Sequence, residues 1–135
     1  MNDLKRNLQG SDRRDIFKRV HKTLSRRFYA CDLDFVWAEK SPPGIVAFVD
    51  YKHPSDGITF SEVLVYNDLL KIAPVYIVEG SNPELGPFRV VSYLGGDWHP
   101  EPPKTQTETV CVCKTWAELE AFEGKLRQTY RDKQT

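Results

Sequence analysis

The sequence predicts an α/β fold in which helices cover both faces of a mixed β-sheet. The expected order of elements is a helix, a hairpin of two apolar segments, a second helix, three further strands and a last helix. The second helix lies between two apolar strands, which is the arrangement that a parallel crossover requires. Strands and helices that alternate in this way predict a layered α/β domain.

The first elements follow from capping residues and helical spacing. Residues 1–10 are polar and end in Gly10, so we expect them to form a flexible N-terminal arm, and residues 11–135 to form a single domain. Ser11 or Asp12 can cap a helix. Its apolar positions recur at helical spacing, at Ile16, Phe17, Val20, Leu24 and Phe28.

The middle of the chain predicts a hairpin and then a strand–helix–strand unit. The apolar segments 33–38 and 45–50 are joined by a Ser-Pro-Pro-Gly turn at 41–44. A helix that begins at Thr59 or Ser61 and runs to about Ala73 precedes a buried strand at 74–79. We therefore expect this strand to lie parallel to the second strand of the hairpin.

The C-terminal part predicts two strands and a helix. Residues 88–94 and 108–113 are typical of strands, and the proline-rich segment 95–104 between them is expected to be a loop. Thr115 and Glu118 have the spacing of a capping box, which opens a helix that runs to about Arg131.

Two carboxylates and an ammonium are expected to meet at the hairpin. Asp34 lies on its first strand, and the second strand ends in Asp50, Tyr51 and Lys52. Because side chains two apart share a face of a strand, Asp50 and Lys52 point the same way, while Tyr51 points away and leaves its backbone carbonyl near the site. Oxygen ligands of this kind select Mg²⁺ or Mn²⁺. The implied reaction is phosphodiester hydrolysis, with Asp34, Asp50 and Lys52 as catalytic residues.

This pattern resembles the PD-(D/E)XK nuclease superfamily, whose signature is an acidic residue, a spacer across a hairpin, and then Asp or Glu, any residue, and Lys. Asp34 and the triplet 50–52 match that signature. The resemblance implies a restriction-endonuclease-like fold, with Asp34, Asp50 and the Tyr51 carbonyl as metal ligands. Asp32 competes with Asp34 because both lie on one face of the strand. Asp34 is preferred because it directly precedes an apolar triplet.

Within the superfamily, the chain is most similar to the RecB-like branch. That branch carries a Gln-x-x-x-Tyr motif on the next helix, and this chain has Glu62 and Tyr66 at that spacing, so the Tyr matches and the Gln does not. The superfamily often places a Glu on its first helix, and this branch a His. No Glu occurs before Glu39, which leaves His21, or Asp15, as the candidate.

Charge is balanced overall, with nineteen basic and nineteen acidic side chains, but not along the chain. Basic residues crowd the first helix, where Arg14, Lys18 and Lys22 are candidate contacts to a nucleic acid, most plainly DNA. A solvated helix face is the alternative explanation.

Cysteine content and hydropathy indicate the cellular compartment in which the protein is expected. Three cysteines are too few and odd in number for a disulfide framework, which predicts a reducing, cytoplasmic environment. No apolar run approaches the ~20 residues of a membrane span, so no membrane association is expected. A zinc site from Cys31, Cys111, Cys113 and His99 is a weak alternative, because no Cys-x-x-Cys pair is present.

Two functions of different classes remain open at this point. The first is a metal-dependent nuclease that acts on DNA or RNA. The second is a nuclease-fold protein that binds nucleic acid or serves as an assembly subunit without cutting. The chain has no phosphate-binding Gly-x-x-x-x-Gly-Lys-Ser/Thr, no Gly-x-Gly-x-x-Gly and no Gly-x-Ser-x-Gly motif. Its small size favours a homodimer, as a hypothesis.

Overall fold

The computed structural model describes residues 11–21 and 31–134, and contacts divide the chain into two units, Met1–Asp32 and Leu33–Thr135. The first unit contains helix α2 (Ser11–His21), on which the side chains of Arg14, Ile16 and Phe17 are exposed. The expected arm at 1–10 and the second half of the expected first helix, at 22–28, lie outside the described residues. That residues 11–135 form one domain stays a prediction.

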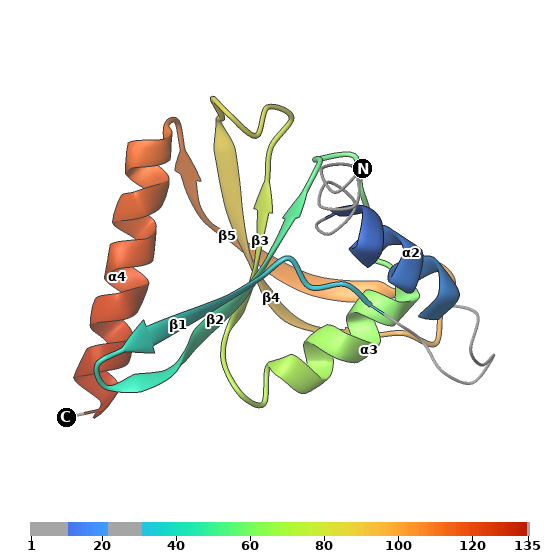
Figure 1. Cartoon of the computed structure of the whole chain (residues 1–135), viewed down its shortest axis with the longest axis horizontal. Helices are drawn as coiled ribbons and strands as arrows, with labels where there is room; N and C mark the ends of the chain where they lie inside the picture. The colour runs from blue at the N-terminus through green and yellow to red at the C-terminus, as the bar shows by residue number, and fades with distance from the viewer. Residues whose placement is uncertain (1–10, 22–30, 135) are drawn as a thin grey trace, which may run out of the picture. The chain divides into compact units, whose positions relative to one another are not determined.

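The second unit is built on a five-stranded mixed sheet with the strand order β1-β2-β3-β4-β5 (Figure 1). Only the pair β2 and β3 is parallel, and the other neighbours are antiparallel. The prediction of an α/β fold with a mixed sheet is therefore confirmed. The strands are β1 (Phe35–Lys40), β2 (Pro43–Lys52), β3 (Val75–Glu79), β4 (Phe88–Asp97) and β5 (Lys104–Cys113).

Helix α3 (Phe60–Leu69) connects the two parallel strands, as expected of a crossover. Thr59 caps it, because the Thr59 hydroxyl accepts from the Glu62 backbone while the Glu62 carboxylate accepts from the Thr59 backbone. The helix ends earlier than the predicted Ala73. After Leu69 the chain forms backbone hydrogen bonds between residues three apart. One of them joins the N–H of Ile72 to the carbonyl of Leu69 at 2.9 Å.

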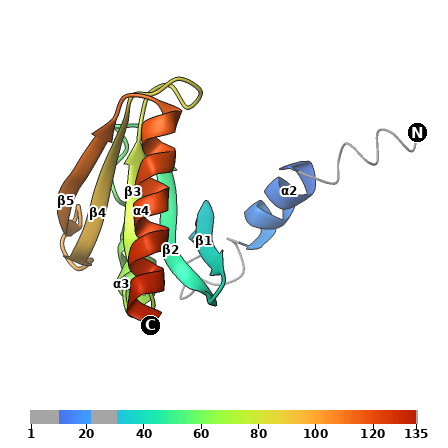
Figure 2. The ribbon, with the colours of Figure 1, turned by 90° about the vertical axis from the view of Figure 1, so that its left-hand side faces the viewer.

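Helix α3 and helix α4 (Trp116–Gln134) cover opposite faces of the sheet (Figures 1 and 2). Alternate residues of β2 show this directly: Ala47 and Val49 belong to the core that includes Leu119 of α4, whereas Phe48 belongs to the core that includes Tyr66 of α3. The sheet is thus the middle layer of three. No helix formed by the described residues is long and apolar enough to cross a membrane.

The expected loop at 95–104 is present but shorter than predicted, because only residues 98–103 lie outside the strands. Strand β4 continues to Asp97 and β5 begins at Lys104, where these two residues pair across the ladder. The register shifts between Tyr93 and Gly95, and Gly95 has a φ of +143°, which glycine adopts without steric cost. The added strand residues, 95–97 and 104–107, are polar or glycine, so no alternation of apolar side chains indicated a strand there. Backbone pairing with the neighbouring strand forms it.

Candidate active site at the end of strand β2

The structure brings Asp34 and Asp50 together across the hairpin. Phe35 pairs with Val49, so Asp34, directly before β1, lies beside Asp50. The backbone N–H of Asp34 donates to Oδ1 of Asp50 at 2.7 Å, and the backbone N–H of Tyr51 donates to Oδ2 of Asp34 at 2.8 Å. Each carboxylate is therefore held by a backbone amide next to the other carboxylate.

Asp50 is a buried acid, with 3% of its surface exposed. Burial raises the pKa of its carboxyl above the ordinary value of 3.8, because the charged form loses solvation. Hydrogen bonds from the Tyr66 hydroxyl and the Asp34 backbone act in the opposite direction, while the charges of Asp34 and Glu62 raise the pKa further. Asp50 thus lies in the kind of environment in which functional acids are found.

Lys52 shares the face of Asp50 and is paired with an acid of helix α3. Its Nζ lies 2.8 Å from both carboxylate oxygens of Glu62, and the two side chains are 13% and 14% exposed. The Tyr66 hydroxyl, which donates to Asp50, also lies 3.3 Å from Oε2 of Glu62. Asp50, Lys52, Glu62 and Tyr66 therefore form one connected polar group between β2 and α3.

Tyr51 points to the opposite face of the sheet, as the strand period predicts. Its hydroxyl donates to the backbone carbonyl of Gly80 at 2.6 Å. That the backbone carbonyl of Tyr51 is a metal ligand stays a prediction.

The chemistry of this group suits a hard cation. Asp34, Asp50 and Glu62 supply oxygen donors, and with one ammonium from Lys52 the three carboxylates leave two formal negative charges. Among the described residues, however, no three His, Cys, Asp or Glu side chains converge so as to hold a metal ion. Mg²⁺ commonly takes one or two protein carboxylates and completes its shell with water. That Asp34 and Asp50 hold such an ion stays a prediction.

The other candidates belong to the first unit, Met1–Asp32. His21 is the last residue of α2, and its side chain and that of Lys18 are outside what the structure describes, as is Lys22 altogether. Arg14 is exposed on the same helix. Their predicted roles, and that of Asp15, stay predictions.

The weak zinc alternative gains no support from the described part of the chain. The Sγ atoms of Cys111 and Cys113 lie 3.8 Å apart, and burial raises the pKa of the Cys113 thiol to about 11. His99 instead lies against Asp97, with Nδ1 2.7 Å from the carboxylate, and stacks on Trp98.

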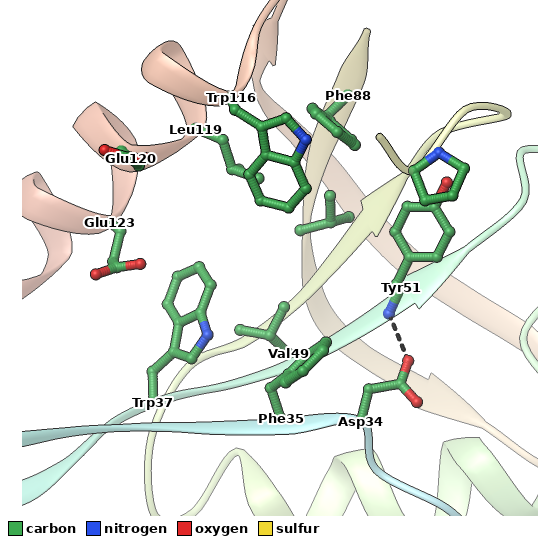
Figure 3. A pocket seen from close by; sticks show the side chains of 12 residues that line it. Asp34, Phe35, Trp37, Val49, Tyr51, Phe88, Trp116, Leu119, Glu120 and Glu123 are labelled. Atoms are coloured by element: carbon green, nitrogen blue, oxygen red, sulfur yellow. Dashed lines mark hydrogen bonds between the residues drawn. The ribbon is translucent and has the colours of Figure 1, made fainter. Parts of the chain in front are cut away.

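A cavity on the other face of the sheet was not predicted from the sequence. It has a volume of about 580 Å³ and lies between strands β1 to β4 and helix α4 (Figure 3). Phe35 and Trp37, two apart on β1, gave a hint that these rings share a face. Nothing in the sequence places Trp116 of the distant helix against the same space.

Comparison of the chain with protein-family models, curated proteins and solved structures gave no match.

Proposed function

We propose that this protein is a metal-dependent nuclease that hydrolyses phosphodiester bonds in DNA or RNA. The single observation that supports it best is that the Asp34 backbone N–H donates to the Asp50 carboxylate, while the N–H of the next residue, Tyr51, donates to the Asp34 carboxylate. Lys52 lies two residues after Asp50 on the same face of the strand. The PD-(D/E)XK signature requires this juxtaposition. The mixed sheet between two helical layers agrees with the restriction-endonuclease-like fold, which is itself part of the proposal.

In this proposal Asp34 and Asp50 would hold Mg²⁺ or Mn²⁺, which supplies a Lewis acid and an activated water at neutral pH. The backbone amides of Asp34 and Tyr51 orient the two carboxylates, and the Tyr66 hydroxyl keeps Asp50 in place. Lys52 offsets negative charge that develops on the phosphate. Glu62 positions the Lys52 ammonium through their ion pair.

The test is cleavage of single-stranded, duplex and branched DNA and of RNA in Mg²⁺ or Mn²⁺. Asp50→Asn and Lys52→Met are each expected to lower the cleavage rate by about a hundredfold or more. This is the usual effect of removing one electrostatic contact to a transition state. Matched controls are Asp68→Asn and Lys71→Met, which break an ion pair whose side chains are 77% exposed. They should cut like the wild type.

Folding must be checked in the same variants by circular dichroism. Asp50→Asn is expected to stay folded, because a neutral amide removes the cost of burying a charge. Equal cleavage by wild type and Asp50→Asn, with both folded, would contradict the proposed site.

A protein that binds nucleic acid without cutting is the second candidate, and one observation favours it. Both oxygens of Asp50 already accept hydrogen bonds, from the backbone of Asp34 and from Tyr66, and Lys52 is bound to Glu62. Calorimetry with Mn²⁺ separates the two functions. A protein that binds DNA but does not bind Mn²⁺ supports the second function. A homodimer stays a prediction, which sedimentation of the protein with and without DNA would test.

A further inference from the structure

Aromatic rings and carboxylates surround the cavity beneath helix α4. Five rings contribute to its wall, two from β1 and one each from β2, β4 and α4: Phe35, Trp37, Tyr51, Phe88 and Trp116. Aliphatic side chains and Pro83 complete the apolar lining. A cavity of about 580 Å³ falls within the range of about 300–1,000 Å³ that small-molecule sites occupy, and an apolar wall with few polar groups is their usual composition.

Several of these rings are fixed in place before any ligand arrives. The Trp116 indole N–H donates to the carbonyl of Glu84 at 2.6 Å, and its ring meets Phe88 at 5.0 Å. The Tyr51 hydroxyl is anchored on Gly80. Preorganised walls lower the entropy cost of binding.

The same rings leave much apolar surface open to solvent. Phe35 is 54% exposed and Trp116 is 48% exposed, although both are large hydrophobic residues. A ligand in the cavity would cover this surface, and burial of apolar area favours association.

The charged residues that line the cavity are all acidic, although Arg127 of α4 interacts electrostatically with one of them, Glu123. Asp34, Glu120 and Glu123 line it, and among the described residues of the lining there is no Lys, Arg or His. Figure 3 shows Glu120 and Glu123 on helix α4, on the side of the cavity away from Tyr51 and Asp34. Aromatic faces also attract cations, because their quadrupole is negative at the face. Carboxylates and rings together therefore select a positively charged group.

We propose that this cavity binds a small organic cation, with an ammonium or quaternary ammonium group on an aromatic or aliphatic body. The apolar body would lie against the rings, and the positive group would face Glu120 and Glu123. A nucleotide would bring its phosphate against the same carboxylates, so this ligand differs in charge from the nuclease substrate. The inference does not rest on the proposed nuclease function.

Three probes of similar shape test whether the cavity prefers a positively charged ligand. They are benzyltrimethylammonium, benzyl alcohol and benzoate. Each probe is titrated into the full chain, and NMR spectra record the indole N–H signals of the three tryptophans. The signals that shift report where the probe binds. Saturable shifts at Trp37 and Trp116 are expected with the cation, weaker ones with the alcohol and none with benzoate. Trp98 is an internal reference, because it stacks with His99 and meets Phe60, away from the cavity.

A pair of variants tests the carboxylates themselves. Glu120→Gln combined with Glu123→Gln should weaken the cation roughly 2- to 30-fold, if each exposed charge pair contributes as such pairs usually do. The control is Glu101→Gln combined with Glu108→Gln, two exposed acids outside the lining, which should leave the affinity unchanged. Both double variants alter exposed side chains only, so both should fold.

Three results would overturn the proposal. They are no saturable shift with the cation at millimolar concentration, benzoate binding as tightly as the cation, and an affinity for the cation that the Glu120 and Glu123 variant leaves unchanged.

Discussion

Replacing Tyr66 by Phe removes one hydroxyl from the buried polar group and leaves the ring. Tyr66 is fully buried, and its hydroxyl donates to Asp50 and also contacts Glu62. Its ring meets Tyr93 at 5.2 Å, a contact that Phe keeps. The variant therefore isolates the loss of a hydrogen bond to a buried carboxylate.

The expected cost follows from the charge of the acceptor. A hydrogen bond to a charged group contributes about 1.5–3 kcal/mol, whereas one between neutral groups contributes about 0.5–1.5 kcal/mol. For a chain of this length, each kcal/mol lowers the melting temperature by about 3–5 °C. Tyr66→Phe should therefore melt roughly 5–15 °C below the wild type at pH 8.

The loss of stability in Tyr66→Phe should increase as the pH rises. The hydroxyl lowers the pKa of the folded Asp50 carboxyl, so its removal raises a pKa that burial already holds above 3.8. Below pH 3.8 the carboxyl is protonated in the folded and the unfolded chain, and only a neutral hydrogen bond is lost. As the pH rises through the raised pKa, the full cost appears.

Urea unfolding between pH 4 and pH 8 measures this dependence, with Tyr93→Phe as the matched control. Tyr93 is also fully buried, and its hydroxyl donates at 2.6 Å to the neutral amide of Asn67. Its loss should cost about 0.5–1.5 kcal/mol without a change across this range. The reasoning is refuted if both variants lose the same free energy of unfolding at every pH.

Two further predictions concern contacts between helix α4 and the hairpin. Glu39 is bound to Arg127 at 2.9 Å and Arg131 at 3.2 Å, chiefly through hydrogen bonds that lower the pKa of its carboxyl from 4.5 to about 2. Glu39→Gln should therefore lower the melting temperature above pH 4.5, and the difference should vanish as the pH falls towards 2. In Gly44→Ala the new methyl group would meet the Tyr130 hydroxyl, which donates to the Pro43 carbonyl at 3.0 Å. Displacing that hydroxyl should cost about 1 kcal/mol in urea unfolding.

The controls for these two variants lie elsewhere in the same unit. Glu101→Gln changes an exposed loop acid and should melt like the wild type at every pH. Gly57→Ala places a methyl group in open space and should not be destabilised by a clash. A difference between Glu39→Gln and the wild type that persists at pH 2, or equal stability of both Ala variants, would contradict the assigned contacts.

Much of the fold was predictable because it depends on neighbouring residues. The turn at 41–44 and two apolar segments indicated the hairpin, and strand β2, helix α3 and strand β3 formed the expected parallel crossover. The alternation of side chains on β2 predicted that Asp50 and Lys52 share a face and that Tyr51 does not. The juxtaposition of Asp34 and Asp50 followed from the same two local patterns.

Tertiary structure decided which partner each side chain meets. Lys52 binds Glu62 because the crossover lays α3 over β2, and the same packing gives Asp50 the Tyr66 hydroxyl and its raised pKa. Strands β4 and β5 extend through polar residues because backbone pairing does not need an apolar pattern. The cavity depends on bringing Trp116 of α4 over the rings of β1. Local sequence determines periodicity and turns, whereas burial and long-range contacts depend on where distant elements come to lie.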